Sequence, residues 1–380
     1  MMPETKGKVL FVPKLKAAEG TSERSPMMLK LLRERFRVEE VPAGRVCEFA
    51  CDPRGHRFAR YLMFPLGELH LFLRTLSRLR KEQAVVFAEG SYFALPAALA
   101  CKLRSAPAIW DNHGNVRTYG KSVGKSLYFI ASNEMLEGVL ERLSAKVLVV
   151  SERDRQSYVE AGFPHPKLEV VPTCVELAVV DRTPAKDEAR KKLGLPGDVP
   201  LVLFFGTLSY GPNLEAASCI AQNIAPRVRG RIPGARFAIA GGGCPPGGLG
   251  DGVDLLGFVP DIHLWISASD VCIAPIWSGV GILTKVIDML SHSRPTVVSP
   301  LALDGMPELH HGTNCLVGQN AQGFADNIVA VLRDKEMGWL LGRSGRELVE
   351  AKYSCDRIGA QVKDLVRGLM EEYSLGAEDG

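Results

Sequence analysis

The chain has 380 residues, of which 46% are hydrophobic and 23% are charged, and its formal net charge at pH 7 is +3. This composition is typical of a globular protein long enough for two domains, and the near-neutral charge gives no support for a nucleic-acid partner. No apolar run reaches the ~18 to 20 residues that span a bilayer, and no signal peptide precedes the first apolar run, so a cytoplasmic protein is expected.

The nine cysteines are scattered, odd in number and without a Cys-x-x-Cys pair. Several lie in apolar runs, which favours buried free thiols in a reducing compartment over disulfides or a zinc site.

The first half of the chain alternates apolar strands with helices. Strands are predicted at 8–12, 37–41, 84–88, 108–110, 146–150 and 168–171, and helices after the Ser25-Pro26 cap and at 65–81, 94–103 and 134–143. Apolar strands separated by helices indicate a parallel sheet that is covered on both faces.

A charged segment rich in Pro and Gly, residues 176–200, predicts a linker, after which the alternation restarts. Strands are predicted at 201–205, 236–240, 253–256, 271–274, 296–299 and 316–317, and helices from Pro212 and at 261–268, 282–290 and 323–333. We therefore expect an α/β protein with two doubly wound, Rossmann-like domains that face a central cleft, where such folds bind ligands.

A glycine loop in the second half has the composition of a diphosphate site. Gly279 and Gly281 precede the predicted helix 282–290, and glycines before a helix N-terminus let backbone N–H groups approach an anion. Lys285 supplies a cation, and Asp288 is a carboxylate that accepts hydrogen bonds from sugar or ribose hydroxyls. The alternative is an ordinary strand-to-helix turn with a solvated Lys285–Asp288 pair.

The second half resembles the nucleotide-sugar domain of GT-B glycosyltransferases, in particular the retaining family 4. The resemblance covers roughly 150 residues and rests on pieces in the family's order, namely residues 205–213, 238–242, 257–261, 268–270, 274–276, 278–281, 285–289 and 295–299. Tyr353-Ser354 before a final helix is also similar. In the first half the likeness is limited to residues 111–114, 147–152 and 171–175.

This chain departs from the family's pattern at two places. Ser278 stands where relatives commonly carry the first of two glutamates, and Asp288 stands near the second. Residues 207–213 contain neither the Arg nor the Lys that many relatives place there. In a branch with Gly-x-Gly-x-x-x-Lys, which this chain resembles, Lys285 alone contacts the phosphates.

The resemblance implies a domain order and a set of site residues. The domains are 1–175 on the acceptor side, the linker 176–200, the donor domain 201–355, and a C-terminal helix, 356–380, that packs back towards the first domain. His113 is the expected catalytic residue, facing the donor sugar. The expected donor-binding residues are Gly20, Gly206, Asn213, Val259, Ser278, Gly279, Gly281, Ile282, Lys285 and Asp288.

Plainer interpretations stay open for several of these residues. His113 is alternatively a turn histidine beside Asp111, Gly20 a flexible loop glycine, and Asn213 a helix-start residue. Phe258 and Val259 lie against a nucleobase or pack internally. The run Gly241 to Gly243 is a poor dinucleotide fingerprint because prolines follow it.

The expected function is transfer of a sugar from a nucleotide-sugar donor to an unknown glycan, lipid-linked or small-molecule acceptor, with retention. No cofactor and no metal are expected, since no Asp-x-Asp or His/Asp cluster with ligand spacing lies near either glycine loop. The alternatives are a nucleotide-sugar epimerase of similar fold and a catalytically silent nucleotide-sugar-binding subunit.

Helix 65–81 raises the question of peripheral membrane contact. It carries Leu69, Phe72, Leu73, Leu76 and Leu79 on an expected apolar side, and Arg74, Arg78, Arg80 and Lys81 near its end. In membrane-associated relatives such a helix touches anionic lipid. An internal packing helix with a solvated basic face is the favoured alternative.

Overall fold

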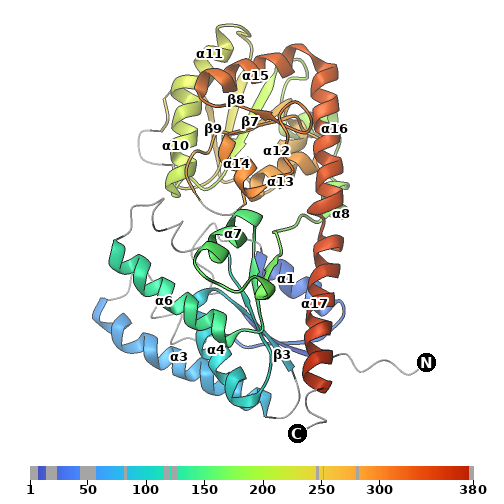
Figure 1. Cartoon of the computed structure of the whole chain (residues 1–380). Helices are drawn as coiled ribbons and strands as arrows, with labels where there is room; N and C mark the ends of the chain where they lie inside the picture. Colours follow the sequence, from blue (N-terminus) through green and yellow to red (C-terminus); the bar gives the residue numbers. More distant parts are fainter. Residues whose placement is uncertain are drawn as a thin grey trace, which may run out of the picture. The chain divides into compact units, whose positions relative to one another are not determined.

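The computed structural model separates the chain into two compact units, which are described one at a time (Figure 1). Unit 1 comprises Met1–Pro172 and Ile358–Gly380, and unit 2 comprises Thr173–Arg357. The structure describes residues 7–13, 24–42, 57–80, 84–114, 120, 126–244, 248–250, 252–279 and 282–375, with side chains of α3 from residue 65 onwards. Gly20, Lys81 and Gly281 lie outside the described residues.

The sheet of unit 1 is parallel and has the strand order β2-β1-β3-β4-β5-β6. Its described strands are β1 (Lys8–Val12), β2 (Arg37–Glu40), β3 (Ala84–Glu89), β4 (Ala108–Asp111), β5 (Lys146–Val149) and β6 (Leu168–Val170). Each lies within one residue of its predicted bounds, and β3 and β4 are buried along their whole length, as strands covered on both faces must be.

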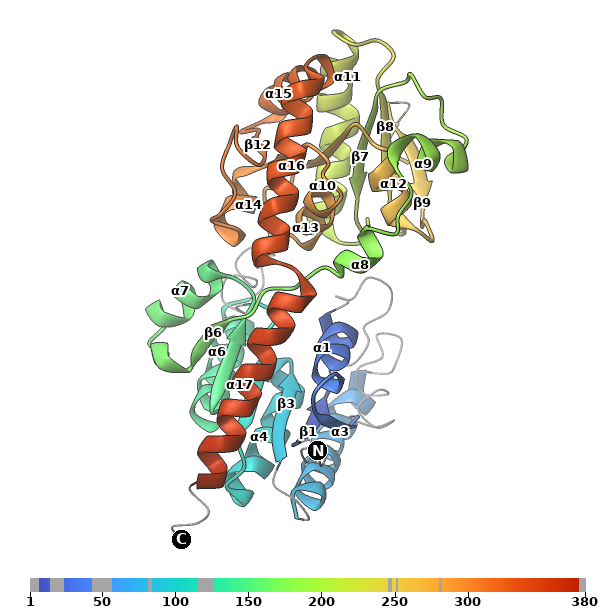
Figure 2. The same ribbon diagram turned by 90° about the vertical axis from the view of Figure 1, so that its right-hand side faces the viewer.

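Helices cover both faces of this sheet. The described helices are α1 (Arg24–Arg33), α3 (Arg57–Leu79), α4 (Ser91–Arg104), α6 (Leu127–Leu143), α7 (Glu152–Glu160), the short 3₁₀ helix η1 (His165–Lys167) and the greater part of α17 (Cys355–Leu375). The core under α3, α4 and α6 contains Leu71, Ala97, Trp110 and Leu140. On the other face α17 packs against α1, where a Cβ at Gly359 would lie 2.8 Å from Leu31 (Figure 2).

Helix α3 differs from its prediction. It begins at Arg57 rather than at residue 65, and its buried stripe contains Leu71, Thr75 and Leu79. Leu69 and Leu73, expected on the same apolar side as Leu79, are each 52% exposed. The sequence has leucines on more than one side of this helix, so composition did not identify which side packs on the sheet.

The segment 176–200, predicted as a linker, belongs to unit 2 and contains α8 (Leu177–Val180) and α9 (Lys186–Leu193). Arg190 of α9 is 2% exposed and donates to Asp270 Oδ2 at 2.5 Å and to the Ala268 carbonyl at 2.9 Å. Through Arg190 the segment 176–200 is therefore hydrogen-bonded to the rest of unit 2 and is not a solvated linker.

Unit 2 repeats the same design with the strand order β12-β11-β10-β7-β8-β9. Its described strands are β7 (Leu201–Phe205), β8 (Arg236–Ala240), β9 (Asp254–Gly257), β10 (Val271–Ala274), β11 (Thr296–Val298) and β12 (Leu316–Val317). Successive residues of β7 enter different cores: Val202 and Phe204 contact one side, and Leu203 the other. This alternation is the period of two expected of a strand.

Each side of this sheet has its own helices (Figure 1). The first side is covered by α10 (Gly211–Cys219), the π-helix η2 (Ile220–Ile224), α11 (Ala225–Arg229) and α15 (Ala321–Arg333). The second side is covered by α9, α12 (Ile262–Ala268), α13 (Thr284–Ser291), α14 (Pro300–Gly305) and α16 (Lys335–Lys352).

Candidate functional site

The carboxyl ends of β7 and β10 form the topological switch point of unit 2. From β7 the chain continues to β8 and β9 on one side, and then crosses to β10, β11 and β12 on the other. The loops after β7 and β10 therefore lead to opposite sides of the sheet. Helix α10 begins after the first loop and helix α13 after the second. In open α/β sheets this is the place where ligands bind.

Lys285, in the first turn of α13, points its ammonium into this place. Its Nζ donates a hydrogen bond to Asn213 Oδ1 at 2.5 Å and lies 4.7 Å from the centre of the Phe204 ring. Asn213 Nδ2 donates to the Thr207 carbonyl at 2.9 Å, which orients the amide oxygen towards Lys285. Burial lowers the pKa of Lys285 to about 7.

Two glycines make this arrangement possible. A Cβ at Gly206, where φ is +153°, would lie 2.6 Å from Lys285 Nζ and 2.7 Å from Asn213 Nδ2. A Cβ at Gly241 would lie 2.0 Å from the Gly206 carbonyl oxygen. The glycine run after β8 thus lets the loop after β7 approach closely, and Gly206 leaves the room that the Lys285 ammonium occupies.

The other residues expected at the donor site lie around the same two loops. Gly279 is buried, with φ +139°, and Ile282 is partly buried. Asp288 lies three residues after Lys285 on α13 and is partly buried. Among the described residues the Lys285 ammonium pairs with Asn213 and not with Asp288, so the two do not form the solvated pair considered as an alternative.

Glu215 is a residue of this site that sequence reasoning missed. Ser278 Oγ, after β10, donates to Glu215 Oε2 of α10 at 3.4 Å. A carboxylate therefore lies beside the position where relatives carry a glutamate in the glycine loop. The two residues are 63 positions apart, and an exposed Glu on a helix gives no signal in the sequence.

The loop after β9 presents an aromatic side chain to solvent. Phe258 is 81% exposed, and the neighbouring Val259 is partly buried. Internal packing, the alternative considered for both residues, is therefore wrong for Phe258. Gly257, at φ +66°, accepts a hydrogen bond from Gly241 N–H at 2.7 Å, which ties this loop to the glycine run after β8.

Unit 1 has a second cluster, at the carboxyl ends of β3 and β4. Arg24, the first residue of α1, donates to both oxygens of Asp111, with Nη2–Oδ1 at 2.7 Å and Nε–Oδ2 at 3.0 Å. His113 Nε2 lies 3.2 Å from Asp111 Oδ2. Burial alone would raise the pKa of Asp111, but Arg24 and His113 outweigh it and hold this pKa well below its ordinary value.

The turn that carries His113 is fixed from both sides. Asn112 N–H donates to the Leu148 carbonyl at 2.9 Å, the Asn112 side-chain amide donates to the Tyr158 hydroxyl, and Asn112 Oδ1 accepts from Gly114 N–H at 3.2 Å. The His113 side chain is 17% exposed, so one edge of a ring held by a buried carboxylate faces solvent. When Nε2 donates to Asp111, Nδ1 has no partner within the part of the chain that the structure describes and can face a ligand.

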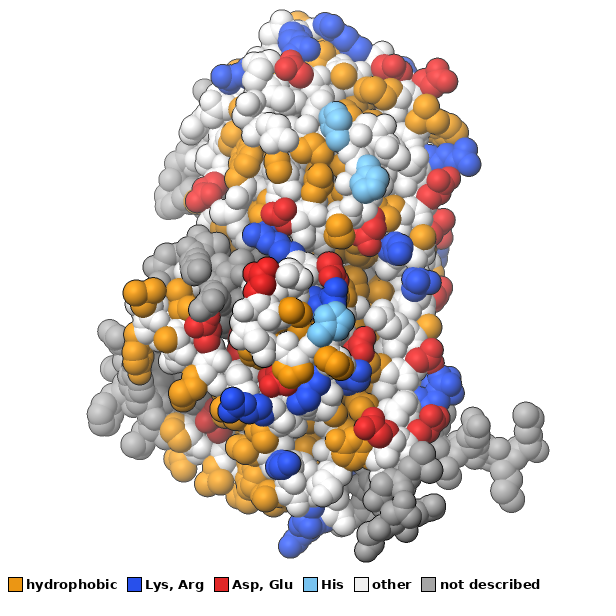
Figure 3. Space-filling model, viewed as in Figure 1, with side chains coloured by type: hydrophobic (Ala, Val, Ile, Leu, Met, Phe, Trp, Pro, Cys, Tyr) orange, Lys and Arg blue, Asp and Glu red, His pale blue; other side chains and the backbone are white. Residues whose placement is uncertain are grey.

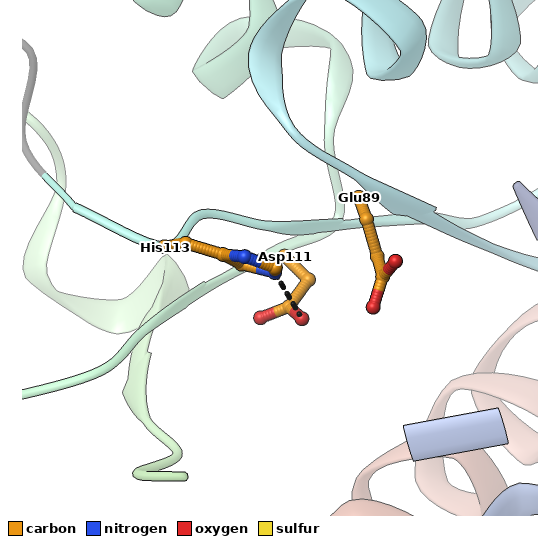
Figure 4. Close-up of side chains that lie close together, drawn as sticks. All are labelled: Glu89, Asp111 and His113. Atoms are coloured by element: carbon orange, nitrogen blue, oxygen red, sulfur yellow. Dashed lines mark hydrogen bonds and ion pairs between the residues drawn. The ribbon is translucent and has the colours of Figure 1, made fainter. Parts of the chain in front are cut away.

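Glu89 completes the cluster, which Figure 4 shows. It ends β3, pairs in register with Asp111 at the end of β4, and accepts a hydrogen bond from Ser25 Oγ. Glu89, Asp111 and His113 each place one ligand atom within 4.8 Å of the others. Such a set could not be expected from the sequence, because Glu89 lies 22 positions before Asp111 and belongs to another strand.

Comparison with known families matches both parts of the chain to glycosyltransferases. Residues 199–334 match the family model described as "Glycosyl transferases group 1", and residues 28–179 match "Glycosyltransferase Family 4". The first range contains Lys285 and its neighbours in unit 2. The second contains Glu89, Asp111 and His113 of unit 1 and begins four residues after Arg24.

The chain is also 26% identical over 344 residues to the GDP-mannose-dependent alpha-(1-6)-phosphatidylinositol monomannoside mannosyltransferase of Mycobacterium tuberculosis, covering 84% of this chain and 85% of that protein. Two examples represent the solved structures that share its fold. Sucrose-phosphate synthase from Thermosynechococcus elongatus has a TM-score of 0.73 at 17% identity, with 97% of this chain and all of that chain covered. Anabaena HepE in complex with UDP has a TM-score of 0.72 at 15% identity, with 95% and 100% covered.

Proposed function

Since the chain is a glycosyltransferase with the GT-B fold, we propose that unit 2 binds the diphosphate of a nucleotide-sugar donor at Lys285 and that unit 1 contributes His113 to sugar transfer. The observation that carries the proposal is the ammonium of Lys285, held by Asn213 in the space that Gly206 leaves open at the switch point of unit 2. A thermal-shift panel of nucleotides and nucleotide sugars tests it. Stabilisation by a nucleoside diphosphate in the wild type and its loss in Lys285→Met support the site, and equal shifts in both contradict it.

In the transfer, the bond between the sugar C1 and the phosphate oxygen breaks while a bond from an acceptor hydroxyl oxygen to C1 forms. The leaving diphosphate oxygen takes the electron pair of the broken bond and the proton that the acceptor hydroxyl loses. Lys285 and the amides at the N-terminus of α13 stabilise the charge that develops on the leaving oxygen. Retention of configuration is part of the proposal, and product analysis by NMR tests it.

His113 orients the donor sugar and stabilises the charge that develops near C1. Asp111 fixes the ring through Nε2, and Arg24 keeps Asp111 ionised, so the ring's orientation is set before the substrate arrives. Around the other loops, Glu215 and Asp288 accept hydrogen bonds from sugar or ribose hydroxyls, and Phe258 and Val259 lie against the nucleobase.

Transfer without a metal is also proposed, although Glu89, Asp111 and His113 have ligand chemistry. Arg24 donates to both oxygens of Asp111, so a cation already satisfies the carboxylate that a metal would need. Activity is expected to persist in excess chelator. Complete loss of activity on chelation, with recovery on adding manganese or magnesium, would contradict this. If Glu89→Gln also prevented that recovery, the cluster would be assigned to a metal.

GDP-mannose is the first donor to test, because the mycobacterial relative is named for its use of GDP-mannose. UDP-glucose is the second, because Anabaena HepE has been solved with UDP-glucose at 15% identity and a TM-score of 0.69. The panel distinguishes them: a larger shift with GDP than with UDP supports the first, and the reverse result supports the second.

Two other functions give different results. An epimerase would convert the nucleotide sugar with no acceptor present, and a silent binding subunit would bind the donor without turnover. Product analysis after incubation with donor alone, and then with donor and candidate acceptors, separates both from a transferase.

A peripheral membrane contact through unit 1 would suit a lipid-linked acceptor. No helix in the described part of the chain is long and apolar enough to cross a bilayer. On α3, α4 and α6, however, large apolar side chains are exposed, and Figure 3 shows hydrophobic side chains gathered over these helices at the lower left. The exposed large apolar residues of these three helices are Leu66, Leu69, Leu73, Tyr92, Leu99, Leu103, Leu127, Tyr128, Met135 and Val139.

The basic residues of this face divide into two groups. Arg74 donates to the Pro42 carbonyl and Arg78 pairs with Glu39, so these two contact unit 1 itself. Lys102 and Arg104 at the end of α4 are exposed beside Leu103 and are available to anionic lipid. We expect salt-sensitive flotation with anionic liposomes, weakened in Leu69→Ser/Leu73→Ser. Equal behaviour with neutral liposomes would favour a face that is only solvated.

A further inference from the structure

Two cysteines lie side by side where the chain passes between the units. Cys174 is the second residue of unit 2 and Cys355 is the third from its end. The Sγ atom of Cys174 donates a hydrogen bond to the Sγ atom of Cys355 over 2.7 Å, although 181 positions separate the residues. We propose that Cys174 and Cys355 form a reversible disulfide that joins the two ends of unit 2.

The backbone holds the pair in place. Val175 and Ser354 form a parallel bridge, in which Val175 N–H donates to the Tyr353 carbonyl at 2.9 Å and Cys355 N–H donates to the Val175 carbonyl at 3.0 Å. Cys174 directly precedes Val175 and Cys355 directly follows Ser354, so this bridge holds the two cysteines beside it. The sulfurs need to approach by less than ~1 Å to reach bonding distance.

The two sulfurs differ in access in the way that thiol–disulfide exchange requires. Cys355 begins α17 and is partly exposed, whereas Cys174 is 4% exposed. Cys272 and Cys315, by contrast, are each 0% exposed, so an oxidant in solvent does not reach their sulfurs. Access through Cys355 therefore distinguishes the pair from the buried cysteines.

The chemistry balances with glutathione disulfide as the oxidant. The Cys355 thiolate attacks one glutathione sulfur, forms a mixed disulfide and releases one glutathione thiolate. The Cys174 thiolate then attacks the Cys355 sulfur and releases the second glutathione. Two electrons pass from the two cysteines to glutathione disulfide, and the two protons that the cysteines lose are taken up by the released glutathiones. Excess reduced glutathione reverses both steps.

The bond would close a loop containing almost all of unit 2, and long loops give the largest entropic stabilisation of the folded state. We expect the melting temperature of unit 2 to rise by at least ~5 °C on oxidation. Cys355→Ser should abolish this rise, and Cys219→Ser, another partly exposed cysteine of unit 2, should keep it. Equal rises in Cys355→Ser and the wild type would contradict the proposal.

Peptide mapping of the wild-type chain tests the bond without relying on any variant. Trypsin releases Cys174 in residues 168–182 and Cys355 in residues 353–357, and each peptide contains a single cysteine. After incubation with glutathione disulfide, rapid alkylation and digestion, mass spectrometry should find these two peptides linked, and reduced glutathione should separate them. Both peptides alkylated and unlinked after excess glutathione disulfide would overturn the proposal.

Discussion

Arg24 and Asp111, 87 positions apart in the sequence, form a two-bonded ion pair that is almost completely buried in unit 1. The pair positions the first residue of α1 against the end of β4, and through Asp111 it positions His113. An Arg–carboxylate pair with two parallel bonds fixes orientation as well as distance. The pair therefore contributes both to the packing of unit 1 and to the geometry of the His113 cluster.

Arg24→Met should destabilise unit 1, because it leaves the Asp111 carboxylate buried without its principal cation. Breaking a buried pair from one side costs about 3 to 5 kcal/mol. Denaturant unfolding measures the loss. The double variant Arg24→Met/Asp111→Asn should recover part of it, since the Asp111 charge is removed together with that of Arg24. Equal destabilisation by the single and double variants would show that packing of the Arg24 side chain, rather than the charge pair, accounts for the effect.

His113→Ala should lower turnover by ~10² or more while nucleotide affinity stays nearly unchanged, because His113 belongs to unit 1 and the diphosphate site to unit 2. Steady-state kinetics and calorimetric titration with a nucleoside diphosphate give the two values. His70→Ala, at an exposed histidine of α3, is the control. A normal turnover in His113→Ala would assign the residue to the turn alone.

Nucleoside diphosphate binding should weaken as pH rises above 7. Burial lowers the pKa of Lys285 to about 7 in the free protein, so above this pH the side chain is mostly neutral and must take up a proton when the diphosphate binds. The affinity should fall by up to roughly tenfold per pH unit between pH 7 and 9. Calorimetry in buffers of different ionisation enthalpy measures the proton uptake. Lys285→Met should show neither effect, and a pH-independent wild type would contradict the prediction.

His292 should make unit 2 less stable in mild acid. Burial, and then His263, Arg294 and Arg346, lower the pKa of His292 to about 3. The unfolded chain, with an ordinary histidine pKa of ~6.5, binds more protons than the folded chain between pH 6.5 and 3. The free energy of unfolding contributed by His292 is therefore fully present above pH ~6.5 and is lost as pH falls, by at most ~1.4 kcal/mol per pH unit.

Urea unfolding at pH 7, 6 and 5 measures this loss, and fluorescence reports mainly on unit 2, which contains three of the four tryptophans. His292→Gln should reduce the dependence on pH, whereas His310→Gln, at an exposed position, should leave it unchanged. The same slope in all three proteins would assign the acid sensitivity to other groups.

The sheets can be predicted from the sequence because most of their strands are short apolar runs bounded by turns, as in β7 and β8. The side on which a helix packs is harder to predict. On α3 the leucines lie on more than one side, and the side that packs is decided by the sheet beneath it, as the exposed Leu69 and buried Leu71 show. In the segment 176–200 the charges resembled those of a linker, but Arg190 is buried against Asp270.

The same limit applies to the site. Lys285 can be predicted as a site residue because a glycine loop and a helix start lie next to it in the sequence. Its contacts with Asn213 and Phe204, and the Ser278–Glu215 contact, come from other strands and helices brought together by the sheet order. Glu89 and Arg24 are charged residues whose role depends on burial, which local sequence does not reveal.

The most direct test is calorimetric titration of Lys285→Ala and Asp288→Ala at pH 6.5, where the wild-type ammonium is mostly protonated, with nucleoside diphosphate, nucleotide sugar and inorganic pyrophosphate. Lys352→Ala, at an exposed lysine of unit 2, is the control. Loss of a charge-assisted contact of ~1.5 to 3 kcal/mol in Lys285→Ala should weaken all three ligands by roughly 10- to 100-fold.

In Asp288→Ala, the loss of hydroxyl hydrogen bonds should weaken nucleotide-sugar binding by ~0.5 to 3 kcal/mol and leave pyrophosphate, which has no hydroxyl to offer Asp288, nearly unaffected. That split between the two variants is the result predicted for a nucleotide-sugar site at this loop. Wild-type affinities for every ligand in both variants would contradict it and would remove the donor from the switch point of unit 2.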